Sequence, residues 1–128
     1  MIKGIHHVAM KCSSDEQYAK TKYFYMNVLS LPLKGEWEDG FLADTGAGCV
    51  EIFRTGGDDL KKGAIRHFAF ACTDVDGAVD RIKEAGYTVF MEPNDIVIPA
   101  SPPIKARIAF CTGPLGEEIE LFDEKESE

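Results

Sequence analysis

The sequence predicts an α+β fold in which two βαβββ repeats form a cupped mixed sheet around a metal site, with the helices on its outer face. Three observations predict it. The stretch HHVAMKC of the first half returns as RHFAFAC, with His67 standing 60 residues after His7. The run CVEIF around Glu51 returns as EIELF around Glu120, 69 residues later. In both halves an amphipathic segment follows the first of these runs, so the repeat covers helices as well as strands.

The length favours one domain over residues 1–128, built from a first module at 1–54 and a second at 65–123. A chain of 128 residues can bury enough surface for a core without disulfides or structural metals. With 45% hydrophobic and 28% charged residues, the composition is that of an ordinary globular protein.

In the first half, Ser14 followed by Gln17 is typical of a capped helix start. Apolar residues then recur at helical spacing from Tyr18 to Val28, and Pro32 ends the helix. Three strands are expected after it, near Leu33–Trp37, Phe41–Asp44 and Cys49–Phe53.

In the second half, an apolar stripe from Val75 to Ala85 predicts a helix that stops at Gly86. Strands are expected near Thr88–Met91, Lys105–Phe110 and Glu118–Phe122. The segment Pro93–Pro103 has no counterpart in the first half. We expect it to be an irregular loop that could act as a lid.

The charge balance excludes several classes of partner. Lys and Arg number 14 against 22 Asp and Glu, giving a net charge of -8 that repels nucleic acids and anionic membrane surfaces. No apolar run reaches the ~20 residues of a membrane span, and no signal-peptide core is present, so a cytoplasmic location is expected. The four cysteines form no CxxC pair and are expected to be reduced and mostly buried.

Strand alternation predicts a metal site. In each half it separates a bulky apolar face, which should meet the helix, from a face that carries one His and one Glu. If the sheets enclose one concavity, His7, Glu51, His67 and Glu120 converge there, and buried carboxylates call for a cation. His6 falls on the apolar face and is the weaker candidate.

The donor set indicates the kind of metal. Imidazole nitrogen with carboxylate oxygen suits one divalent ion per site, and Ni, Zn, Co, Fe and Mn all remain open. We expect no cysteine on the face that carries the donors, which argues against a structural zinc site.

The chain resembles the vicinal oxygen chelate superfamily, the glyoxalase, bleomycin resistance and dioxygenase group. The resemblance lies in HHVAM and RHFAF, in the helix end FYMNVLSLPL and in the closing GPLGEEIELF, and it covers nearly the whole chain. It implies that His7, Glu51, His67 and Glu120 are metal ligands, as in its glyoxalase I-like and epimerase branches.

The resemblance implies a metal-dependent lyase or isomerase similar to lactoylglutathione lyase. The substrate would be a small α-oxo or hydroxy-carbonyl compound, such as the hemithioacetal of methylglyoxal and a thiol, reacting through an enediolate with Glu51 or Glu120 as catalytic base. The alternatives are a coenzyme A ester epimerase and a protein that sequesters a drug without transforming it. A homodimer is expected, with each site formed within one chain or between two.

Four residues are candidates for contact with the substrate. Lys11 lies four residues after the first predicted ligand, where glutathione-using glyoxalases often carry Arg. Arg107 could also meet an anionic group, although a solvated or edge-strand charge is the favoured explanation. Trp37 and Phe53 are expected either to wall the cavity or to pack in the core. Ser30 replaces the glycine that is common in this turn of the family.

Overall fold

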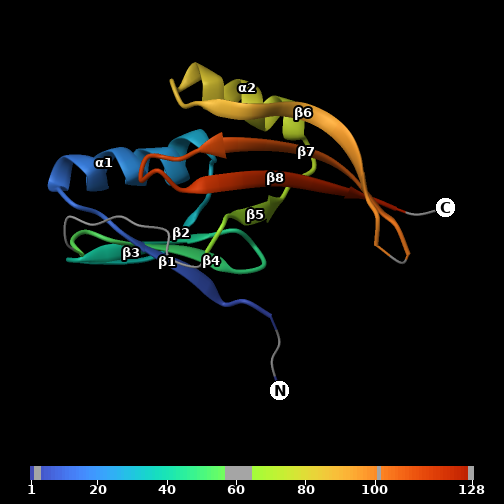
Figure 1. The fold of residues 1–128 in the computed structure, drawn as a ribbon. Coiled ribbons are helices and arrows are strands. Elements are labelled where there is room, and N and C mark those ends of the chain that lie inside the picture. Colours follow the sequence, from blue (N-terminus) through green and yellow to red (C-terminus); the bar gives the residue numbers. More distant parts are fainter. Residues whose placement is uncertain (2–3, 57–64, 101, 127–128) are drawn as a thin grey trace. The chain divides into compact units, whose positions relative to one another are not determined.

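The computed structural model describes residues 1, 4–56, 65–100 and 102–126 of the chain. The chain divides into two compact units, Met1–Lys61 and Lys62–Glu128, and each unit contains one helix-and-sheet module (Figure 1). Both modules follow the order βαβββ. The predicted α+β class with two βαβββ repeats is therefore confirmed.

The first unit has a four-stranded mixed sheet in the order β1-β4-β3-β2, with β1 parallel to β4 and antiparallel pairs elsewhere. Its elements are β1 (His7–Lys11), α1 (Asp15–Tyr23), the π-helical segment η1 (Phe24–Val28), β2 (Leu33–Trp37), β3 (Gly40–Asp44) and β4 (Cys49–Phe53).

The second unit repeats this topology as β5-β8-β7-β6, again with the first strand parallel to the last. Its elements are β5 (Phe68–Ala71), α2 (Val75–Glu84), β6 (Val89–Ile98), β7 (Ile104–Thr112) and β8 (Glu118–Lys125). The repeat in the sequence is thus a repeat of strand pairing as well as of element order.

The first helix starts as predicted and ends differently. Ser14 accepts a hydrogen bond from the Gln17 N–H at 3.1 Å, while the Gln17 side chain returns to the N–H of Ser13. The last turns widen into a π-helix, and Ser30 follows them with a φ of 59°. This left-handed conformation, which glycine adopts more easily, explains why glycine is common at the position.

Each helix covers one face of its own sheet. In the first unit the Tyr18 ring of α1 packs edge-on against Phe41, which is in register with Ile52 of β4. In the second unit the buried apolar side chains of α2 and β8 include Val75, Val79, Ile82, Ile119 and Leu121. The bulky apolar faces predicted from strand alternation are the faces beneath the helices.

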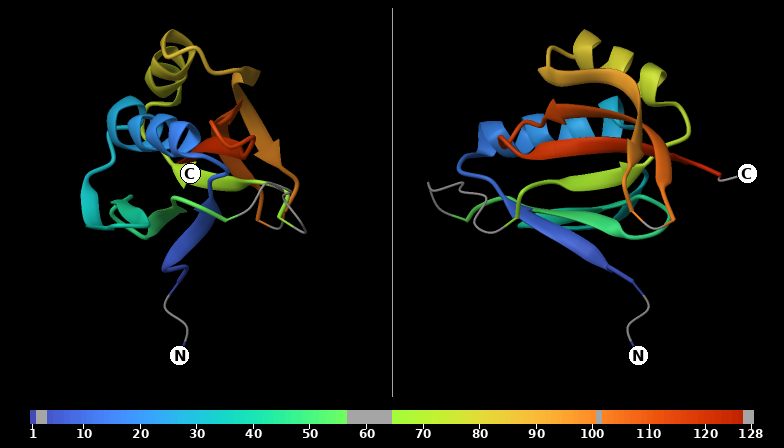
Figure 2. Two further views of the ribbon diagram at one scale, coloured as in Figure 1. Left: turned by 90° about the vertical axis from the view of Figure 1, so that its left-hand side faces the viewer. Right: turned by 45° about the vertical axis from the view of Figure 1, so that its right-hand side comes forward.

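The segment Pro93–Pro103 is for the most part not the irregular loop that the sequence suggested. β6 continues to Ile98 and is paired with β7 along its length, and both strands curve strongly (Figure 2). Pro93 stands at an irregularity of register between Met91 and Asn94, on the edge strand of the sheet, where its missing N–H breaks no ladder bond. The prediction of an irregular loop is therefore wrong for residues 93–98.

No helix within the described ranges is long and apolar enough to cross a membrane. All four cysteines are free thiols: Cys12, Cys49 and Cys111 are buried, and Cys72 is half-buried.

Candidate metal centre

The first unit places His7 and Glu51 side by side on neighbouring parallel strands. In the register of β1 and β4, His7 lies opposite Cys49 and Ala9 opposite Glu51, so these residues share one face of the sheet. The His7 Nε2 atom lies 3.5 Å from Glu51 Oε1. Phe41 and Ile52, which pack under α1, belong to the other face, so the pair lies on the face that the helix leaves open.

The second unit builds the same pair from the matching positions. His67 directly precedes β5, and the register of β5 and β8 sets Ala69 opposite Glu120. The His67 Nε2 atom lies 3.3 Å from Glu120 Oε1. The predicted repetition of one nitrogen donor and one oxygen donor per module is therefore present in the geometry of each module.

The two pairs differ in their exposure to solvent. The side chains of His67 and Glu120 are 31% and 11% exposed, against 43% and 17% for His7 and Glu51. Burial raises the pKa of the Glu120 carboxyl above its usual value, and the nearby His67 opposes this shift. The second pair is thus more strongly desolvated than the first. In the metal-free protein the Glu120 carboxylate is therefore more basic than an ordinary glutamate.

The separations suit two ligands of a single ion. With metal–nitrogen and metal–oxygen bonds of about 2.0–2.2 Å, two ligands at octahedral or tetrahedral angles stand roughly 2.9–3.5 Å apart. The contacts of 3.5 and 3.3 Å fall in that range. Among the residues that the structure describes, no group of three or more His, Cys, Asp or Glu side chains is placed to hold an ion. The ligand set of four therefore stays a prediction.

A cysteine does lie on the face that carries the first pair. Cys49 stands two residues before Glu51 on β4 and opposite His7 in the register, and it is 5% exposed. The expectation that this face holds no cysteine is wrong, and strand alternation from Glu51 was the signal that could have found it.

The two imidazoles are held by different neighbours, which the sequence did not indicate. His6 precedes β1, and its Nδ1 atom lies 3.0 Å from Nδ1 of His7. His67 instead meets the ring of Phe110, which stands opposite Glu120 in the register, at 5.1 Å and 90°. Strand alternation placed His6 on the apolar face, but the residue lies outside the strand and is exposed.

Three of the four predicted substrate contacts share the face of His7 and Glu51. Lys11 lies opposite Phe53 in the register of β1 and β4. Phe53 and Trp37 both lie opposite Gly40 of β3, from its two sides. Because residues opposite one another share a face of the sheet, all three side chains lie on the face of Glu51. The Trp37 and Phe53 rings meet edge-on at 6.0 Å and remain 39% and 36% exposed. Their exposure shows that they are not core residues, and their contact with a substrate stays a prediction.

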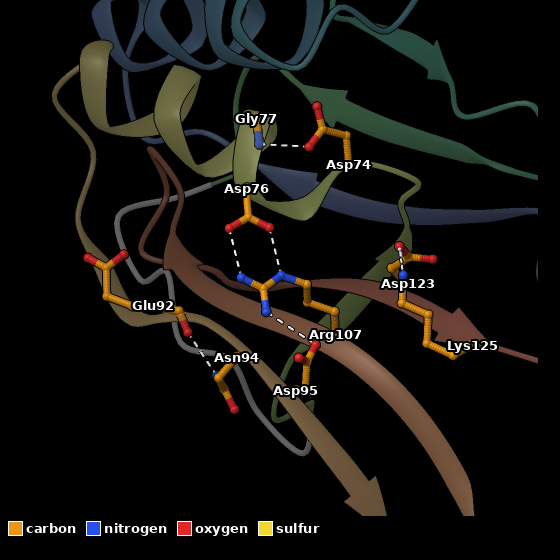
Figure 3. A network of polar contacts seen from close by, with 9 residues as sticks. All are labelled: Asp74, Asp76, Gly77, Glu92, Asn94, Asp95, Arg107, Asp123 and Lys125. Carbon is orange, nitrogen blue, oxygen red and sulfur yellow. Dashed lines mark hydrogen bonds and ion pairs between the residues drawn. The ribbon is translucent and has the colours of Figure 1, made fainter.

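Arg107 occupies the opposite face of its sheet, toward α2. Its Nε and Nη2 atoms donate to the two carboxylate oxygens of Asp76 at 2.6 and 2.8 Å, and Nη1 donates to Asp95 at 3.1 Å (Figure 3). The guanidinium lowers the pKa of Asp76, and the two carboxylates raise the pKa of Arg107. This arrangement ties α2 to the β6–β7 hairpin, and it does not place Arg107 beside His67 and Glu120.

Comparison with known proteins agrees with this architecture. The chain is 27% identical to the uncharacterized protein YaeR of Escherichia coli over 136 aligned positions, which cover 96% of this chain and 98% of that protein. The crystal structure of the fosfomycin resistance protein FosX from Listeria monocytogenes matches with a TM-score of 0.72 and 19% identity, covering 98% of this chain and 96% of that one.

Lactoylglutathione lyase from Agrobacterium tumefaciens matches with a TM-score of 0.64 and 16% identity, covering 96% of this chain and 95% of that one. At these identities the two solved structures establish the fold alone. The sequence profile of one family matches residues 4–121, almost the full length. The chain therefore belongs to the glyoxalase/bleomycin resistance protein/dioxygenase superfamily.

Proposed function

We propose that this protein is a metal-dependent lyase of the glyoxalase I kind, acting on the hemithioacetal of methylglyoxal and a thiol. The observation that carries the proposal is the His–Glu pair found at the same position of both modules, with Nε2–Oε1 separations of 3.5 and 3.3 Å. A lactoylglutathione lyase among the structures of the same fold supports it.

The ligands of this proposal are His7, Glu51, His67 and Glu120. Two neutral imidazoles and two carboxylates suit a divalent ion such as Ni, Zn or Co, with Fe and Mn as further possibilities. Such an ion, when bound, supplies a Lewis acid that makes the C–H next to coordinated substrate oxygens more acidic. The Glu120 side chain, which is 11% exposed, fits this role, because a cation stabilises a carboxylate that is largely removed from water.

Glu120 is the carboxylate best suited to move the proton. Its Oε1 atom lies 3.3 Å from His67 Nε2, and its side chain is the less exposed of the two glutamates, at 11% against 17%. Removal from water makes a carboxylate a stronger proton acceptor. In the proposed reaction Glu120 accepts the proton from one substrate carbon and returns it to the neighbouring carbon. Glu51 also faces a histidine in its own module and is the other candidate.

The substrate contacts follow from the open face of the first module. Lys11 offers an ammonium to a carboxylate of the thiol, and no ion pair of Lys11 occurs among the described residues. Trp37 and Phe53 offer half-exposed rings to its apolar part. Since Trp37 is the single tryptophan of the chain, its fluorescence reports directly on this face.

Metal analysis is the first test. Protein loaded with Ni²⁺ or Zn²⁺ should retain about one ion per chain after desalting, and His67→Ala and Glu120→Gln should lose it. Glu117→Gln is the matched control, because Glu117 is also buried, at 8% exposure, and its Oε1 atom accepts the N–H of Leu115 instead of meeting a histidine. Retention of metal by Glu120→Gln would contradict the ligand set.

Turnover is the second test. Loaded protein should consume methylglyoxal in a thiol-dependent way, and we expect Lys11→Met to raise KM for an anionic thiol more than it lowers kcat. Lys20→Met, which removes the same charge from α1, should leave both constants unchanged. If metal-loaded protein consumes no methylglyoxal with any thiol tried, the lyase activity is rejected. The protein would then be a metal-binding member of the superfamily with another activity.

Mixing variants tests where the ligands come from. If each site takes ligands from two chains of the expected homodimer, inactive His7→Ala and His67→Ala proteins should regain metal and activity when mixed, since some mixed dimers then hold one intact site. If each site lies within one chain, mixing restores nothing.

A further inference from the structure

His6 and His7 share a hydrogen bond between their ring nitrogens. The two Nδ1 atoms are 3.0 Å apart, and the rings stand nearly perpendicular, at 88°. A neutral imidazole carries one proton on one of its two nitrogens, so this contact requires a proton on one Nδ1 and a lone pair on the other. The tautomers of the two rings are therefore coupled.

Two arrangements satisfy the contact. If His6 Nδ1 donates, neutral His7 carries its own proton on Nε2, which faces Glu51 Oε1 at 3.5 Å. If His7 Nδ1 donates, the lone pair of its Nε2 atom faces the carboxylate. Without a cation the first arrangement is favoured, because it sets an N–H rather than a lone pair against the negative charge of Glu51.

A cation reverses this preference. A metal ion binds the lone pair of a neutral imidazole nitrogen, so an ion at His7 Nε2 and Glu51 requires the His7 proton on Nδ1. His6 must then present its own Nδ1 lone pair and carry its proton on Nε2. In histidine metal sites generally, the nitrogen that does not bind the metal donates to a neighbour that orients the ring.

We propose that His6 is a positioning residue that exchanges tautomer with His7 when a divalent cation binds. The shared proton passes from His6 Nδ1 to His7 Nδ1, the His7 Nε2 proton leaves to solvent, and His6 Nε2 takes up a proton from solvent. Each ring holds one proton before and after, so no net proton is released by the pair. This inference rests on the proposed metal site.

The second module provides the contrast. Arg66 occupies the position that matches His6, and the His67 ring packs against Phe110, which offers no nitrogen lone pair. The exchange is therefore a property of the first module alone. Arg66→Ala is the matched control for His6→Ala, because each changes the residue that directly precedes a predicted ligand.

Long-range ¹⁵N–¹H NMR tests the exchange directly, since the chain contains only three histidines. In metal-free protein with neutral imidazoles, we expect His6 as the Nδ1–H form and His7 as the Nε2–H form. Saturating Zn²⁺ should convert His7 to Nδ1–H and His6 to Nε2–H. If His7 changes with Zn²⁺ while His6 keeps its tautomer, the inference fails and the proposed metal site stands.

Zn²⁺ affinity gives the second readout. We expect His6→Ala to weaken binding about 10- to 100-fold, and His6→Gln, whose amide oxygen can accept the His7 Nδ1–H, to recover part of the loss. Arg66→Ala should bind as the wild type does. Equal affinities for wild type and His6→Ala overturn the role of His6, whereas the absence of any Zn²⁺ effect at His7 overturns the proposed metal site together with it.

Discussion

Glu120→Gln should make the metal-free protein more stable while it removes metal binding. The Glu120 carboxylate is 11% exposed, and its contact with His67 is 3.3 Å long. Charge-assisted hydrogen bonds are usually shorter, about 2.7–2.9 Å, so this contact recovers only part of the cost of desolvation. A neutral amide of the same shape avoids that cost and can still accept from His67.

The expected gain is about 1 kcal/mol in the free energy of unfolding, the difference between an imperfectly paired buried charge and a neutral hydrogen-bonded group. For a domain of this size that corresponds to a rise in Tm of about 4 °C. A carboxyl whose pKa is raised in the folded state stabilises the fold most below its ordinary pKa, about 4.3 for glutamate. That stabilisation is lost as the pH rises through the raised pKa. The gap between variant and wild type should therefore widen from acid to neutral pH.

Urea unfolding in the presence of a chelator, from pH 4 to pH 8, measures this gap. Glu51→Gln is the matched control and should gain less, because Glu51 is the more exposed carboxylate. Zn²⁺ should reverse the order: at 100 times Kd the wild type gains about 2.7 kcal/mol from binding, and Glu120→Gln gains none. A metal-free Glu120→Gln protein that is less stable than the wild type at neutral pH would show that the carboxylate is well paired and refute the reasoning.

Three further variants test single features of the structure. Ser30→Gly should stabilise the protein by about 0.5–1 kcal/mol in urea unfolding, because Ser30 holds a φ of 59° that glycine adopts without strain; an unchanged midpoint would contradict this. Gly40→Ala should cost about 2 kcal/mol or more, because a Cβ there would stand 2.5 Å from the backbone oxygen of Ile52; a neutral effect on the unfolding midpoint would mean that the strand can shift. Arg107→Met should leave metal affinity and KM unchanged and weaken protection of α2 amides from hydrogen exchange, because Arg107 binds Asp76 of that helix; a raised KM would restore the substrate role inferred for it from the sequence.

Much of the fold was predictable because the two halves of the sequence repeat the same pattern. The recurrence of the His7 and Glu51 runs around His67 and Glu120 predicted that the two halves have the same order of elements, and strand alternation then placed each His and Glu on the same face. These are local rules with a period of two, and the observed registers of β1 with β4 and of β5 with β8 obey them.

The features that the sequence did not reveal depend on contacts between distant or irregular segments. Arg107 meets Asp76 across 31 positions, which no periodicity encodes. Pro93 suggested a break, but an edge strand with a bulge tolerates it. The first helix widens into η1, whose Phe24 and Tyr25 are fully buried, and helical spacing alone does not distinguish this segment from a regular turn.

The alanines beside the two glutamates are positions where substitution can change the space around the proposed site. Ala9 and Ala69 stand directly opposite Glu51 and Glu120 on the adjoining strands, so the position across from each glutamate carries only a methyl group. Exchanging either for a larger residue would narrow the space above a carboxylate without displacing any donor atom. In the proposed site, substitution of Ala9 or Ala69 is therefore a way to change which compounds fit without replacing any of the proposed ligands.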